Sequence, residues 1–166
     1  MDPQIFSRTR TVRRLTEADI PAVLTLCRSN PLFYRHHPPM TTADDIRGDL
    51  TALPPGKTMA DKYYLGFFSG GHLDAVLDLI LDYPTEGTAF LGFFMLDAAL
   101  QGRGTGSALL GEIRAALRAA GYARLRLAID EGNPQSEAFW TKNGFVKTSE
   151  RFPNGSSAYL PMVSEA

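Results

Sequence analysis

The spacing of hydrophobic residues predicts four helices along the chain. Thr16 and Thr42 are typical N-cap residues, each with an aspartate three positions later and hydrophobic residues at helical spacing beyond it. A third helix follows a glycine-rich turn and ends at Gly121, and a fourth ends at Gly144, because glycine readily adopts the backbone conformation that closes a helix. The predicted helices cover residues 16–27, 42–53, 105–120 and 134–143, and residues 30–40 are expected to form a loop.

Strand patterns lie between and after these helices. Residues 88–96 are almost wholly apolar, which is typical of a strand buried on both faces. Residues 72–81 alternate between polar and apolar, so we expect Asp74, Asp78 and Asp82 to share one face of the sheet. The predicted strands cover residues 11–15, 62–68, 72–81, 88–96, 124–129, 145–149 and 157–163.

The order of these elements, β-α-α-β-β-β-α-β-α-β-β, predicts an α/β (α+β) fold. The chain has 166 residues, of which 44% are hydrophobic, and this amount suits one ordinary core. No internal repeat and no long linker interrupts the pattern. We therefore expect a single domain that covers residues 1–166.

Charge and cysteine content narrow the function classes. The formal net charge of -1 gives no general attraction to nucleic acid or to an anionic membrane, and no apolar run is long enough to span a bilayer. Cys27 is the only cysteine and falls on the apolar side of the first helix, where we expect a buried core residue. With no secretory signal at the start, we expect a cytoplasmic protein, monomeric or homodimeric, and we assign no metal ligands.

The glycine-rich turn after the apolar strand is typical of an anion-binding site. Residues 101–107 read Gln-Gly-Arg-Gly-Thr-Gly-Ser and lead into an amphipathic helix. Backbone N–H groups at glycines and at a helix N-terminus can surround a pyrophosphate. A P-loop needs a lysine after its last glycine, and a dinucleotide motif needs glycine at position 107, so both patterns fail here.

Two motifs resemble the GNAT superfamily of N-acetyltransferases. The turn matches the cofactor motif of that family, which is Gln or Arg, two residues, Gly, one residue, then Gly or Ala. Residues 133–145 match the second signature, an asparagine, a short helix and a closing Gly-Phe. Together with the element order, the resemblance covers nearly the whole chain.

The resemblance implies a mixed, mostly antiparallel twisted sheet of about seven strands flanked by four helices. The sheet would splay open between Thr88–Leu96 and Arg124–Ile129, and acetyl-CoA would lie in that gap as the co-substrate. The reaction would be direct attack of a primary amine on the thioester, with a backbone N–H near Phe94 or Met95 facing the oxyanion. The implied cofactor-binding residues are Phe94, Met95, Leu96, Gln101, Gly102, Arg103, Gly104, Thr105, Gly106, Ser107, Asn133, Ser136 and Trp140.

One position departs from the family pattern. Trp140 stands where many members have a tyrosine that protonates the departing thiolate, and an indole N–H has no useful acidity. We interpret Trp140 as a residue that stacks on the cofactor arm or as a core aromatic. Tyr159 is the candidate acid, with Tyr64 and Tyr83 as further candidates. A CoA-binding module without catalysis, or a nucleotide-binding α/β protein, is the alternative.

Candidate residues on the acceptor side come from two segments. A hairpin between the third and fourth strands would place Asp78 opposite Leu91, near the thioester, and Asp78 is our candidate base. The 30–40 segment borders the acceptor in the family, and its candidate substrate contacts are Phe33, Tyr34, His36 and His37. Because residues 61–97 carry six acids against one lysine, we expect a cationic acceptor, either a small-molecule amine or a lysine or peptide.

Overall fold

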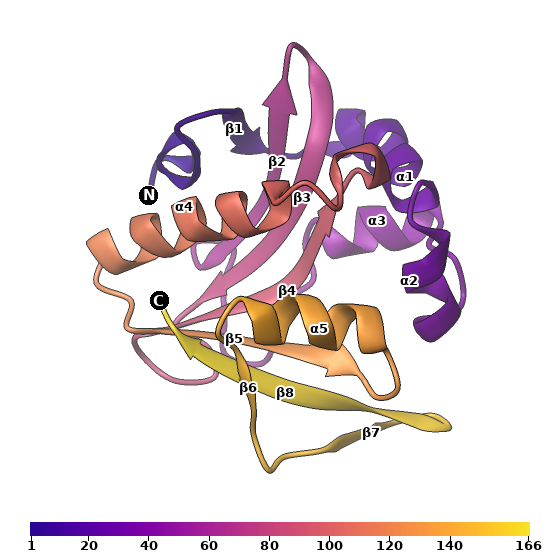
Figure 1. Cartoon of the computed structure of the whole chain (residues 1–166). Coiled ribbons are helices and arrows are strands. Elements are labelled where there is room, and N and C mark those ends of the chain that lie inside the picture. Colours follow the sequence, from indigo (N-terminus) through magenta and orange to yellow (C-terminus); the bar gives the residue numbers. More distant parts are fainter.

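A computed structural model describes residues 1–166 and contains one eight-stranded sheet (Figure 1). The strand order is β1-β2-β3-β4-β5-β8-β6, and β7 also pairs with β8. All pairings are antiparallel except the one between β4 and β5. The strands are β1 (Thr11–Arg14), β2 (Lys62–Ser69), β3 (His72–Leu81), β4 (Thr88–Leu96), β5 (Arg124–Asp130), β6 (Val146–Lys147), β7 (Phe152–Asn154) and β8 (Ser157–Glu165).

Five α-helices cover the two faces of the sheet. Two of them, α4 and α5, lie on one face, and the first three lie on the other beside β2, β3 and β4 (Figure 1). The helices are α1 (Ile20–Arg28), α2 (Pro31–His36), α3 (Ala43–Asp49), α4 (Thr105–Ala119) and α5 (Pro134–Lys142), with short 3-10 turns η1 (Pro3–Phe6), η2 (Glu17–Asp19) and η3 (Ala98–Leu100). No helix combines the length and the apolar character needed to cross a membrane.

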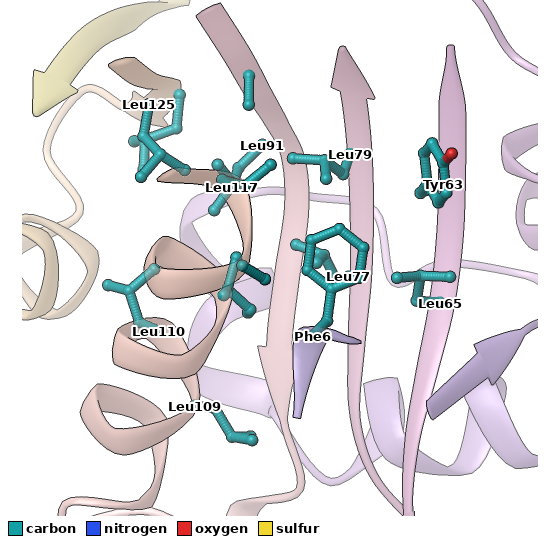
Figure 2. Packing of buried hydrophobic residues seen from close by; sticks show 14 of the residues in the cluster. Phe6, Tyr63, Leu65, Leu77, Leu79, Leu91, Leu109, Leu110, Leu117 and Leu125 are labelled. Carbon is teal, nitrogen blue, oxygen red and sulfur yellow. The ribbon is translucent and has the colours of Figure 1, made fainter. Parts of the chain in front are cut away.

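The larger core lies between the sheet and α4. It contains 24 buried residues, because β2 to β5 each direct alternate side chains toward this face. Leu117 of α4 lies beside Leu91 of β4 in this layer (Figure 2), and Leu109 and Leu110 of α4 belong to the same cluster. Burying one such leucine contributes roughly 1.5–3 kcal/mol, so this layer stabilises the position of α4 and of the glycine turn at its start.

A second core of 11 buried residues lies on the opposite face. It joins α1, α2 and α3 to the sheet through Cys27, Tyr34, Ile46 and Tyr64. Cys27 is buried, as predicted, and is the chain's free thiol. The two faces of the central strands therefore hold different sets of helices.

The parallel pairing between β4 and β5 is short. It joins Thr88–Leu91 to Arg124–Leu127 and stops there, although both strands continue. A β-bulge between Asp78 and Leu79 of β3 leaves Gly92 of β4 without a direct partner at the same level. The sheet therefore opens between β4 and β5 beyond Leu91, as the family resemblance implies.

Several predicted boundaries are wrong. The expected loop at 30–40 contains α2, because Pro31 at its first position favours a helix start. The second helix ends at Asp49 rather than Leu53, and β7 is an additional strand. The observed totals are eight strands and five α-helices, against about seven and four predicted.

Gly66 of β2 tests the packing of the second core. An added Cβ would lie 2.6 Å from Leu15 Cδ2 and 2.9 Å from Leu73 Cδ1, so Gly66→Ala should destabilise the protein by about 1–3 kcal/mol. Gly111 of α4 has open space around it, and Gly111→Ala should stabilise by about 0.5–1 kcal/mol through helix propensity. Urea unfolding of both variants checks this, and equal effects would contradict the packing argument.

Candidate active site

The turn before α4 presents a row of free backbone donors. The N–H groups of residues 102–107 donate to no acceptor in the protein, and no side chain caps α4. Gly102 and Gly104 have φ values of 73° and 81°, in the left-handed region that favours glycine. Arg103 is exposed and makes no ion pair, so its charge is free beside these donors. The turn is built to bind an anion.

Gln101 anchors this turn to the rest of the protein. Its side-chain amide donates to Asn30 Oδ1 and, at 3.0 Å, to the carbonyl oxygen of Leu96. Asn30 Nδ2 donates to the same Leu96 carbonyl at 3.1 Å. The Leu96 carbonyl therefore already accepts two hydrogen bonds within the protein. Asn30 links the glycine turn to the end of β4, and it was not among the predicted site residues.

The gap between β4 and β5 has an apolar wall on the side of α4 and α5. Phe94 of β4 stacks against Phe139 of α5, with ring centroids 6.4 Å apart. Trp140 is buried behind them and contacts Phe94, Phe139 and Phe145 edge to face or tilted. A Cβ on Gly106 would lie 3.1 Å from the Phe139 ring, so α4 and α5 meet closely at this end. The position of Trp140 agrees with a core aromatic that supports this wall.

Asn133 carries an unsatisfied buried group beside the same gap. Its Oδ1 accepts from the Ser136 N–H at 3.1 Å and caps α5, while its Nδ2 has no hydrogen-bond partner. An unpaired buried donor costs about 1–3 kcal/mol unless a ligand completes it. The free donors of the turn, Arg103 and this amide together fit coenzyme A, which has a pyrophosphate and an arm with amide carbonyls.

The opposite face of the gap contains a buried ion pair. Asp78 of β3 accepts a hydrogen bond from Lys62 Nζ at 2.7 Å, and the lysine side chain is only 1% exposed. The other Asp78 oxygen would lie 3.1 Å from a Cβ at Gly92, so this carboxylate occupies the space that the glycine leaves open. Burial raises the pKa of Asp78, and Lys62 partly opposes the shift.

The register of Asp78 differs from the prediction. Asp78 pairs with Phe93 rather than Leu91, because the hairpin register is offset by one residue from the expected one and the bulge at this point adds a second residue to β4. The difference moves Asp78 toward the point where β4 and β5 separate. The expected hairpin is correct, but the alternation of the sequence cannot show a bulge.

The expected row of three aspartates does not exist. A bulge in β3 breaks the alternation near Asp74, which binds Arg10 Nε at 2.8 Å and accepts from Ser69. Asp82 has a φ of 52° and accepts from the Gly87 N–H and the Tyr122 hydroxyl, so it ends the strand at the hairpin turn. Of the three acids, only Asp78 lies at the gap.

Helix α2 bridges the open end of the gap. Phe33 packs edge to face on Phe93 of β4 and lies 5.4 Å from the His37 ring. His37 Nδ1 lies 3.1 Å from both carboxylate oxygens of Asp130, at the end of β5. The His37 ring also lies 6.3 Å from the ring of Tyr159 on β8. These contacts connect β4 through α2 to β8, and the His37–Asp130 pair connects α2 to β5.

The other predicted acceptor residues have different surroundings. Tyr34 is buried in the second core, where burial raises the pKa of its hydroxyl. His36 is half-buried and makes no side-chain hydrogen bond. Phe33 and His37 are therefore the two residues of the predicted set that border the gap.

The candidate acids are three tyrosines. Tyr159 pairs with Asp130 across β8 and β5, and burial followed by the Asp130 charge raises its pKa. Tyr64 is buried opposite Asp78, where burial, followed by the charge of Asp49, raises its pKa. Tyr83 packs on Phe90, away from the open end of the gap. Of the three, Tyr159 lies beside the bridge made by α2.

Comparison with known protein families identifies the class of this protein. A model of the acetyltransferase (GNAT) family matches residues 26–145, which include β4, the glycine turn and the Asn133 motif. The chain therefore belongs to the acetyltransferase (GNAT) family. It is an acyltransferase, and acetyl-CoA is its co-substrate. No curated protein sequence matches the chain.

Solved structures agree with this fold. An acetyltransferase from Thermus thermophilus has a TM-score of 0.77 and 24% identity, over 95% of this chain and 97% of that one. The PaiA N-acetyltransferase from Thermoplasma acidophilum in complex with coenzyme A has a TM-score of 0.68 and 18% identity, over 94% and 98%. The ribosomal-protein-S18-alanine N-acetyltransferase from Escherichia coli has a TM-score of 0.66 and 19% identity, over 94% and 93%.

Some site residues gave no readable signal in the sequence. Lys62 and Asp130 are single charged residues at the ends of strands, and only tertiary structure shows their partners, Asp78 and His37. Asn30 stands just before Pro31, and the Asn-Pro sequence indicates a helix start. It gives no sign of the hydrogen bond that Asn30 accepts from Gln101.

The free N–H groups of the glycine turn predict the effect of Gly104→Asp. Any side chain at a φ of 81° is strained, and a carboxylate here repels the phosphates, so acetyl-CoA should bind at least about tenfold more weakly. Gly155→Asp is the matched control, because it sits at a φ of 58° in the β7–β8 hairpin. Isothermal titration calorimetry measures both, and wild-type affinity in the Gly104 variant would refute the site.

Proposed function

We propose that this acetyltransferase transfers the acetyl group from acetyl-CoA to a primary amine of a small molecule by direct attack. The observation that supports this most is the Asp78 carboxylate, which lies against Gly92 where β4 and β5 separate. A proton acceptor is needed there, because the amine must be neutral before it attacks.

Asp78 is proposed to receive the amine proton. One N–H bond of the ammonium breaks and an O–H bond forms on Asp78, which frees the nitrogen lone pair. The lone pair forms the N–C bond to the acetyl carbon as the C–S bond breaks, and the nitrogen then loses its remaining extra proton to solvent, which leaves a neutral amide. Because burial raises the pKa of Asp78, it is a better base than an exposed carboxylate, while Lys62 holds it in place.

The cofactor side would bind the arm and the phosphates without chemistry of its own. The N–H groups of residues 102–107 and Arg103 would hold the pyrophosphate, and Asn133 Nδ2 would donate to the arm. Tyr159 is proposed to give its proton to the departing sulfur and to regain it from solvent. Its raised pKa supports this role, since the hydroxyl stays protonated near neutral pH.

A CoA-binding module without catalysis is the second candidate, and Trp140 is the observation that favours it. Trp140 replaces the usual acid and packs in the core. Turnover with acetyl-CoA and a panel of primary amines separates the two. Release of free thiol that depends on the amine supports the transferase, whereas tight acetyl-CoA binding without any turnover supports the module.

Asp78→Asn tests the proposed base. The amide keeps the shape of the side chain but cannot take a proton, so kcat should fall by about 10²–10⁴ while acetyl-CoA binds as before. Glu86→Gln removes one exposed carboxylate in the β3–β4 turn and serves as the control. Steady-state kinetics measures both variants, and an unchanged kcat in Asp78→Asn would exclude this residue as the base.

Trp140→Phe tests whether this residue supports the cofactor rather than donating a proton. Loss of the larger ring should weaken acetyl-CoA binding modestly, by less than about tenfold, and leave the shape of the pH profile unchanged. Trp140→Tyr reintroduces a hydroxyl at the position usual in the family. A Phe variant that binds normally but loses orders of magnitude in turnover would show a direct chemical role instead.

A further inference from the structure

Asp49 is a carboxylate on the acceptor side that no part of the reaction above uses. It is the last residue of α3, one turn after Ile46, which is buried with Tyr34 and Tyr64 in the second core. Residues three apart lie on the same face of a helix, so Asp49 is directed toward the sheet. Its side chain remains accessible, because the core ends at this turn.

Asp49 makes no hydrogen bond or ion pair within the chain, unlike the acids around it. Asp78 is bound by Lys62, and Asp130 is bound by His37. On α3 itself, Asp44 pairs with Arg47, and Asp45 accepts from Thr42 at the start of the helix. The one unpaired acid of the helix is thus the one that lies within range of the charges of Asp78, Lys62 and His37.

This placement is unfavourable for a carboxylate in three ways. The negative end of the helix dipole lies at the C-terminus, where Asp49 stands. Partial desolvation by the surrounding residues raises the pKa of Asp49, and the charge of Asp78 raises it further, while Lys62 opposes both. The Lys62 ammonium bonds to Asp78, so Asp49 has no ion-pair partner of its own in the chain.

On the acceptor face, carboxylates therefore outnumber positive charges. Asp49, Asp78 and Asp130 contribute three carboxylates, and Lys62 contributes one ammonium, beside His37. This face also has an aromatic residue, Phe33, which packs between Phe93 of β4 and His37. A cation next to Asp49 would remove the imbalance, and an aromatic ring nearby adds a cation–π contact.

We propose that Asp49 binds the ammonium group of the acceptor and makes the enzyme selective for protonated primary amines. The inference rests on the proposed acetyl transfer at the same site. Asp49 would hold the cation beside Asp78, which takes the proton. Acetylation then turns the ammonium into a neutral amide, so the product loses its ion pair with Asp49 and leaves. The expected acidic face thus involves Asp49 and Asp130 rather than Asp74 and Asp82.

The test compares Asp49→Asn with Asp44→Asn, which removes the same charge from the exposed side of α3. The probes are benzylamine, protonated at pH 7.5, and aniline, a neutral amine of similar size at that pH. In wild type we expect benzylamine to be the better acceptor. In Asp49→Asn its KM should rise by about tenfold or more, with kcat within about threefold and the Kd of acetyl-CoA unchanged. Asp44→Asn should behave as wild type.

A binding readout separates this inference from the proposed function. In thermal unfolding at constant ionic strength, benzylamine should raise the Tm of wild type but not that of Asp49→Asn. Without amine, the variant should melt about 2–4 °C higher, because an unfavourable charge is gone. If no amine is acetylated but this protection pattern holds, the proposed function fails and the Asp49 assignment stands. Equal protection of both proteins, or a wild-type preference for aniline, overturns the assignment.

Discussion

The loss of pairing between β4 and β5 beyond Leu91 is the constraint on which the site depends. Backbone groups in a sheet normally bond to the neighbouring strand, so a strand that continues without its partner leaves polar groups to be satisfied in another way. The structure surrounds this opening with other groups that lack partners: the N–H row of the glycine turn, the amide of Asn133 and the carboxylate of Asp49. The gap is stable because two separate cores hold the strands and helices on either side of it.

Local chemistry in the sequence was sufficient to predict the elements on the α4 and α5 side of this gap. The strand at 88–96, the turn at 101–107 and the helix after Asn133 are each identified by contiguous residues, and the structure has them at nearly the predicted bounds. The first helix, α3 and the C-terminal strands were predicted less accurately, since short elements depend on their neighbours more than on their own residues. The start of α2 was missed because Asn30-Pro31 fits both a turn and a helix start.

The acceptor side was less predictable, for a physical reason. Its charged residues come from β2, β3, α3 and β5, and their roles depend on partners distant in sequence, such as Lys62 for Asp78. Two β-bulges also shift β3 against its neighbours, so alternation places Asp74 on the wrong face and Asp78 opposite the wrong residue. The abundance of acids was visible in the composition, whereas the identity of those at the gap was not.

The hydrogen bonds of Gln101 and Asn30 to one carbonyl have a consequence for how the two ligands influence each other. Asn30 is the residue from which α2 starts, and α2 carries Phe33 and His37 over the acceptor face. The glycine turn on the α4 side of the sheet and the start of α2 on the other side are therefore joined by two hydrogen-bonded side chains. Under the proposed function, a cofactor that orders the turn would also order the start of α2, and by thermodynamic reciprocity an acceptor that orders α2 would favour the turn conformation that binds the cofactor. Binding at either face would then lower the entropy cost of binding at the other.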